Sequence, residues 1–152
     1  LSKEMRGHVP TDDQFEKAFA NATVSKTALA RYYLRSLEMA ANNEAEPAFI
    51  PNSDRETINL EHILPQKPLG NWSAFSEADV RADGKRIGNL ALLQAKRNSD
   101  LKSSSFSDKK VVFKESDFTL TSELAEVNDW SHATIVERQA RMAKLALRAW
   151  AL

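Results

Sequence analysis

Cysteine is absent from this chain of 152 residues. Its absence excludes disulfide bonds, thiolate nucleophiles and zinc sites built on thiolates, and it is compatible with a reducing compartment. Long apolar runs are also missing, because none approaches the roughly 18 residues that a membrane-spanning helix requires. The first residues, 1–4 (LSKE), lack the apolar core of a secretion signal. We therefore expect a soluble, cytoplasmic protein without a membrane partner.

Net charge is absent as well, because 21 Lys and Arg residues balance 21 Asp and Glu residues. The overall charge thus gives no argument for a nucleic acid or an anionic membrane as partner. Basic residues nevertheless concentrate in residues 84–114, where eight Lys and Arg residues stand against two Asp residues. Such a stretch is typical of a surface that binds phosphate groups with an affinity that falls as salt rises.

The length and the apolar content of 42% are sufficient for one buried core, so we expect a single domain over residues 1–152. An initiating methionine is lacking, and a polar start leads directly into a helical pattern, which predicts the C-terminal piece of a longer chain. Within it we distinguish a helical scaffold (1–56), a core with the candidate site (57–105) and a helical closing segment (106–152).

Capping patterns and an apolar face in the sequence predict three helices. Thr11 and Gln14 form the pattern of a capping box that opens the first helix. Apolar residues at three-and-four spacing predict a second helix over about Ser25–Asn42. Asp129 or Ser131 can cap a final long helix, which we expect to pack on the first two.

Two short strands frame the candidate site. Thr57–Leu60 alternates polar and apolar side chains, and Pro65 ends the pattern because proline has no N–H to donate. Ile87–Leu93 is a second apolar strand, and a short helix over residues 95–104 is plausible after it. The loop between the strands contains a helical turn at 77–81. The pattern predicts a strand, strand, helix unit inside a helix-rich α+β fold.

The segment 61–66 (EHILPQ) carries the chemistry, together with Gly88-Asn89-Leu90 and Asn98. A histidine titrates near neutral pH and can take a proton from water, and an adjacent carboxylate can hold a hard cation. Consecutive strand residues project to opposite faces, so Glu61 and His62 converge only if the chain leaves regular strand geometry there, and we expect that it does. The combination points to phosphodiester cleavage.

These residues, together with Arg86–Leu93, Phe106 and Lys109, resemble the C-terminal nuclease domain of GmrSD-type modification-dependent restriction endonucleases. That domain belongs to the His-Me finger, or HNH, superfamily. Further residues resemble its closing helix, namely Trp130, Ile135, Arg138 and the tail Leu145–Trp150. The resemblance implies an α+β, helix-rich domain around a ββα-metal core.

The resemblance also implies a role for each site residue. His62 would be the general base, and Asn89 would orient the loop that holds it. Glu61 and Asn98 would bind one Mg²⁺ or Mn²⁺, which are hard cations that take oxygen ligands. The candidates for contacts with DNA phosphates are Lys96, Arg97, Lys102 and Lys109.

The implied function is a metal-dependent DNA endonuclease that nicks or cuts DNA in bacterial defence against phage. An N-terminal domain of the same protein would sense DNA modification and hydrolyse nucleotide, and the oligomeric state is left open. Two alternatives also stay open. One is a nucleic-acid-binding module that has lost turnover, and the other is a helical protein-interaction or regulatory domain in which residues 61–65 are merely a buried strand.

Overall fold

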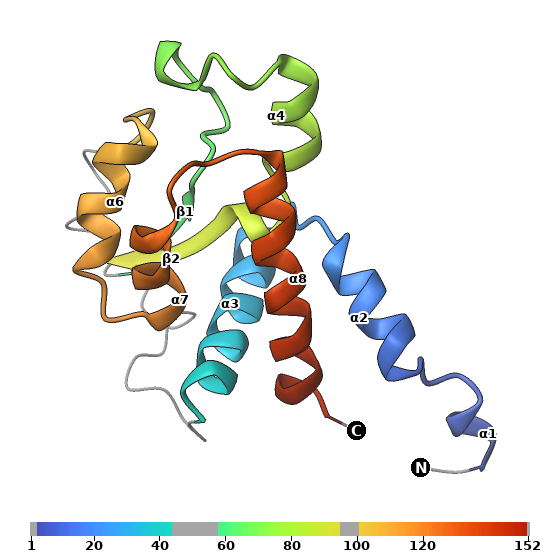
Figure 1. The fold of residues 1–152 in the computed structure, drawn as a ribbon. Coiled ribbons are helices and arrows are strands. Elements are labelled where there is room, and N and C mark those ends of the chain that lie inside the picture. Colours follow the sequence, from blue (N-terminus) through green and yellow to red (C-terminus); the bar gives the residue numbers. More distant parts are fainter. Residues whose placement is uncertain (1–2, 44–57, 95–100, 152) are drawn as a thin grey trace.

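The computed structural model describes residues 3–43, 58–94 and 101–151. The helices of this part are α1 (Lys3–Arg6), α2 (Asp12–Ala20), α3 (Thr27–Asn42), α4 (Glu77–Asp83), α6 (Phe106–Lys114), α7 (Thr119–Ser122) and α8 (His132–Ala149). The short 3-10 helices are η1 (Gly70–Trp72), η2 (Ile87–Asn89) and η3 (Glu123–Glu126), and the strands are β1 (Ile58–His62) and β2 (Leu90–Gln94). Helices around a small antiparallel sheet, as seen in Figure 1, confirm the predicted α+β class.

The helix starts follow from local sequence. At the first turn of α2, Gln14 N donates to Thr11 Oγ1 at 3.2 Å and Thr11 N donates to Gln14 Oε1 at 2.9 Å, which completes the predicted capping box. Ser131 caps α8 in the same way with Thr134. The second predicted helix is α3, which ends at the expected residue, Asn42. All three helix predictions are confirmed.

The two strands pair in an antiparallel register that places His62 opposite Leu90. β1 extends two residues beyond the predicted end at Leu60, so the ladder includes both candidate site residues. β2 begins later than expected, because Ile87–Asn89 form η2 instead of a strand. Asn89 N donates to Arg86 O at 2.9 Å, so this N–H closes a turn and does not bond to β1.

Helices cover both faces of the sheet. Leu90 and Leu92 pack with side chains of α2, α3 and α8, whereas Ala91 and Leu93 pack with α6, η3 and the turn after β1. This alternation follows from the two-residue period of a strand. Figure 1 shows α8 running beside α2 and α3, as predicted, with α6 on the other side of the sheet.

Two buried polar residues fasten α8 to the turn before β2. Arg138 donates to Gly88 O at 2.7 Å and to Leu90 O at 2.8 Å. Gln139 donates to Phe19 O at 2.8 Å and accepts from Gly88 N at 3.2 Å. Because buried polar groups require such partners, these bonds determine where the turn lies against the helical scaffold.

No helix within the described residues combines the length and the apolar character needed to cross a membrane.

The division into a single domain with three segments stays a prediction.

Candidate functional site around His62

His62 is the last residue of β1, and its side chain is half-buried. Its Nε2 lies 3.3 Å from Gln66 Nε2, four residues further along the chain. Burial lowers the pKa of His62 below its ordinary value, and the positive charges of Lys109 and Lys85 lower it further. The imidazole is therefore neutral at neutral pH, which is the form that can accept a proton.

Asn89 holds the turn that follows this histidine. Its Oδ1 accepts from Leu64 N at 2.8 Å and from Trp130 Nε1 at 3.0 Å. Its Nδ2 donates to Leu64 O at 3.0 Å and to Gly84 O at 3.1 Å. The side chain is fully buried, and each of its polar groups is bonded twice. Asn89 thus joins the turn after β1 to the end of α4 and to the closing segment.

Glu61 and Lys109 form a buried ion pair on the opposite face of β1. Glu61 stays in the ladder opposite Ala91, and its Oε1 accepts from Lys109 Nζ at 2.6 Å. Burial raises the pKa of Glu61 and lowers the pKa of Lys109, while each partner counteracts the shift of the other. The expectation that the chain leaves strand geometry at Glu61 and His62 is therefore wrong, because both are paired within β1.

The expected phosphate contact of Lys109 is also wrong. Its exposed fraction is 0%, so its ammonium group does not reach solvent or a DNA backbone. The sequence presented Lys109 as one member of a basic stretch, but charge alone does not tell on which side of α6 a lysine lies.

The described residues do not fit a metal ion held by Glu61. Its carboxylate already contacts an ammonium group, with which a cation would have to compete. The other predicted ligand, Asn98, lies outside the described residues. Within the described part of the chain, no three His, Cys, Asp or Glu side chains lie together so that they could hold a metal ion.

The remaining predicted phosphate contacts divide into two groups. Lys96 and Arg97 lie outside the described residues. Lys102 is exposed in a turn and has a φ of 26°. Lys85 is also exposed and lies close enough to His62 to affect its pKa, although it was not among the predicted site residues. The sequence signal that could have pointed to Lys85 was its position four residues before Asn89.

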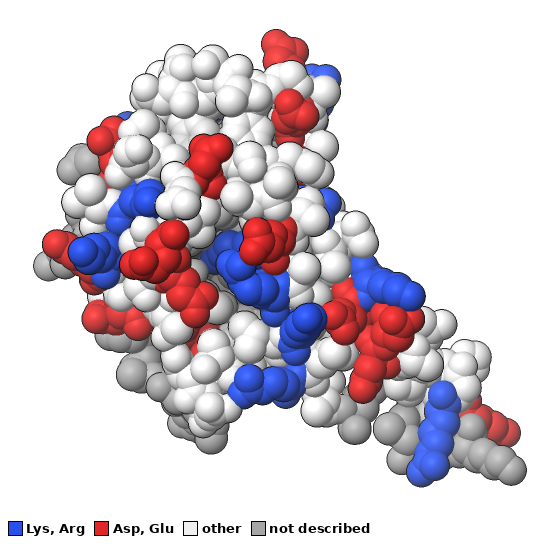
Figure 2. Space-filling view, viewed as in Figure 1, with Lys and Arg blue, Asp and Glu red and all other residues white. Residues whose placement is uncertain are grey.

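Only part of the basic stretch 84–114 reaches the surface. Arg86 is half-buried and donates to Ala20 O at 2.8 Å, and Lys109 is enclosed. On the face shown in Figure 2, blue Lys and Arg side chains alternate with red Asp and Glu side chains. Charges of both signs are therefore mixed on this face.

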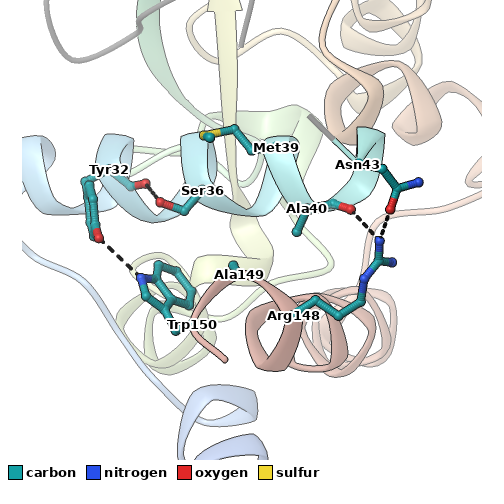
Figure 3. A pocket seen from close by; sticks show the side chains of 8 residues that line it. All are labelled: Tyr32, Ser36, Met39, Ala40, Asn43, Arg148, Ala149 and Trp150. Atoms are coloured by element: carbon teal, nitrogen blue, oxygen red, sulfur yellow. Dashed lines mark hydrogen bonds between the residues drawn. The ribbon is translucent and has the colours of Figure 1, made fainter. Parts of the chain in front are cut away.

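A hollow of about 380 Å³ lies between α3 and the end of α8, as shown in Figure 3. Its polar groups bond to one another: Arg148 donates to Ala40 O at 2.8 Å and also bonds to Asn43, and Trp150 Nε1 donates to Tyr32 Oη at 3.2 Å. None of the predicted site residues lines it. The candidate site is therefore the turn around His62 and not this hollow.

A strand pair that ends in a half-buried histidine, with an asparagine-anchored turn on a helical scaffold, defines a helix-rich α+β domain with a histidine-centred site. The chain belongs to the family of the C-terminal domain of GmrSD restriction endonucleases, whose family model matches residues 9–145. Membership implies a nuclease role related to restriction endonucleases, and it confirms the resemblance recognised from the sequence. No curated protein matches the chain significantly.

Proposed function

We propose that this domain is a DNA endonuclease of a modification-dependent restriction system, in which His62 activates water for phosphodiester hydrolysis. The observation that carries the proposal is the half-buried imidazole of His62, whose lowered pKa keeps it neutral, at a strand end in a chain of this family. Family membership supports DNA as the substrate. An N-terminal sensor domain that uses nucleotide, and a place in bacterial defence against phage, belong to the same proposal.

The chemistry assigned to the chain is a proton transfer. His62 takes a proton from water, the water oxygen forms a bond to phosphorus, and the bond from phosphorus to one ester oxygen breaks, after which this oxygen takes a proton from solvent. The exposed ammonium of Lys85 lies near His62 and attracts the phosphate by its charge. Asn89 keeps the backbone after His62 in place through its bonds to Leu64.

Dependence on Mg²⁺ or Mn²⁺, and the HNH mechanism with Asn98 as a ligand, are part of the proposal and rest on the family resemblance. Such an ion would supply positive charge that stabilises the pentavalent transition state. Because Glu61 contacts Lys109 in the structure, no step is assigned to the metal.

The test is cleavage of supercoiled plasmid with Mg²⁺ or Mn²⁺. We expect nicked or linear product, which disappears with a chelator and with His62→Ala. His8→Ala is the matched control, because His8 is exposed and lies outside the residues 9–145 that the family model matches. Undiminished cleavage by His62→Ala would contradict the role of the imidazole, and intact plasmid with wild-type protein would contradict the proposed activity.

A second candidate is a nucleic-acid-binding module without turnover. It is favoured by the Glu61–Lys109 pair, since an ammonium occupies the carboxylate that the resemblance assigns to a metal. Such a module would shift DNA in a gel without cutting it, with an affinity that falls as salt rises. A protein-interaction domain would do neither.

A further inference from the structure

Lys109 is a fully buried lysine whose ammonium is bonded to three successive residues of one backbone segment. Nζ donates to Glu61 Oε1 at 2.6 Å, to His62 O at 3.0 Å and to Ile63 O at 3.1 Å. An ammonium group has three N–H donors, so all of them are used at the end of β1. A lysine on the distant helix α6 is thus committed to the backbone that carries His62.

An aromatic ring also lies beside this ammonium. Nζ lies 5.6 Å from the ring centroid of Trp72, which attracts a cation through its negative face. Trp72 is itself buried and donates to Ser104 O at 3.1 Å, so its ring is held over the lysine. Exclusion of water strengthens the electrostatic attraction between Lys109 and the oxygens around it.

Two residues, Asn89 and Lys109, hold the backbone after His62. Asn89 binds its N–H groups: Ile63 N donates to Asn89 O at 3.0 Å, and Leu64 N donates to Asn89 Oδ1 at 2.8 Å. Lys109 binds its carbonyl groups at His62 and Ile63. The direction of a side chain follows from its backbone, so these bonds together determine where the imidazole of His62 points.

We propose that Lys109 is a positioning residue of the His62 site, a resident cation that holds the Glu61 carboxylate and the carbonyls of His62 and Ile63. The inference rests on the proposed function for its catalytic consequence only. It replaces two expectations from the sequence, namely that Lys109 binds phosphate and that Glu61 binds a metal ion. Glu61 is instead the counter-ion of Lys109.

The central variant combines Lys109→Met with Glu61→Leu. Replacement of a buried ion pair by apolar side chains of similar volume is often neutral for stability. Removal of one partner alone leaves the other charge buried without a counter-ion. The double variant therefore separates the stability of the pair from the positioning of the turn. Lys114→Met, an exposed lysine of the same helix, is the matched control for the loss of a positive charge.

The readout is hydrogen exchange of the Ile63 and Leu64 amides and the NMR signals of the His62 ring. In the double variant we expect a melting temperature above that of Lys109→Met alone, amide exchange faster than in the wild type by about tenfold, and displaced His62 ring signals. Lys114→Met should leave all three unchanged. A folded double variant with unchanged exchange and ring signals would overturn the proposal.

A measurement on the wild type covers the case in which the double variant does not fold. The Nζ protons of Lys109 should give a resolved NMR signal at neutral pH, because a buried and fully bonded ammonium exchanges slowly with water. Failure to observe any protected lysine ammonium would overturn the proposal.

Cleavage assays add the catalytic consequence. The double variant should lower kcat and leave KM for plasmid unchanged, and it should leave the salt dependence of DNA binding unchanged. A phosphate contact would instead reduce the slope of log affinity against log salt by about 0.9. If the wild type does not cleave DNA, the proposed function fails, and the exchange measurements still decide the positioning role of Lys109.

Discussion

Trp130 and Asn89 are 41 residues apart in the chain, and the indole Nε1 of Trp130 donates to Asn89 Oδ1 at 3.0 Å. The bond connects the segment before α8 to the turn after His62. Trp130 also stacks on Phe106 of α6, with ring centroids 5.3 Å apart. The segment before α8 is therefore connected to the site through the buried side-chain amide of Asn89.

Asn89→Ala should destabilise the fold strongly. The substitution removes the bonds to Leu64, Gly84 and Trp130 and leaves buried groups without partners, which predicts a loss of about 3 kcal/mol in the free energy of unfolding. Trp130→Phe keeps the aromatic stacking and removes one bond, so we expect a loss of about 1 kcal/mol. Urea unfolding measures both. The double variant should lose less than the sum, since the two residues share a bond; strict additivity would contradict the coupling.

Gly88→Ala should destabilise the packing of α8. A Cβ at this position would lie 2.5 Å from Ile135 O and 2.8 Å from Gln139 Cβ, so a backbone carbonyl of α8 would have to move. Overpacking of this kind costs about 1–3 kcal/mol. Gly70→Ala is the control, because a Cβ there meets no atom within 4 Å. Equal melting temperatures for the two variants would contradict the close approach of α8.

The pH dependence of cleavage should follow the lowered pKa of His62. Burial, Lys109 and Lys85 favour the neutral imidazole. The cleavage rate should therefore stay constant as the pH falls below the ordinary histidine pKa of about 6.5, and it should decrease only at lower pH. Folding stability has the same sign: the unfolded chain takes up the proton first, so stability is lost as the pH falls below about 6.5.

Lys85→Met provides the check on this assignment. Removal of its charge should raise the pKa of His62 and shift the acidic limb of the rate profile to higher pH. Single-turnover cleavage between pH 5 and 8 would measure this shift. The electrostatic account would be contradicted if the acidic limb of the wild-type rate profile lay at higher pH than the pKa of free histidine.

Lys102→Ala should weaken DNA binding without a change in fold. Lys102 is exposed, so loss of one phosphate contact predicts a fall in affinity and a reduction of about 0.9 in the salt slope. Fluorescence titrations at several salt concentrations measure the slope. Lys144→Ala, an exposed lysine of α8 outside the basic stretch, is the control, and equal slopes for both variants would remove Lys102 from the DNA-binding surface.

Local signals explain which predictions succeeded. A capping box at Thr11 and an apolar face over α3 are properties of a few neighbouring residues, and both were read correctly. The start of β2 was missed because Ile87 was joined to the apolar run Leu90–Leu93 across the turn-forming Gly88 and Asn89, where the bonds of Arg138 and Gln139 across the fold also favour a turn. The pair of His132 with the buried Asp83 likewise joins residues 49 apart, which no local pattern reveals.

By itself, the sequence determined the α+β class, the positions of the long helices, the histidine at the strand end and the family, because caps, periodicity and motifs lie within short stretches of chain. The tertiary structure alone decided how the charges are used. Glu61 and Lys109 are 48 residues apart, and only the packing of α6 against the sheet brings them within 2.6 Å. Burial then pairs them with each other, since a charge removed from water needs a partner of opposite sign.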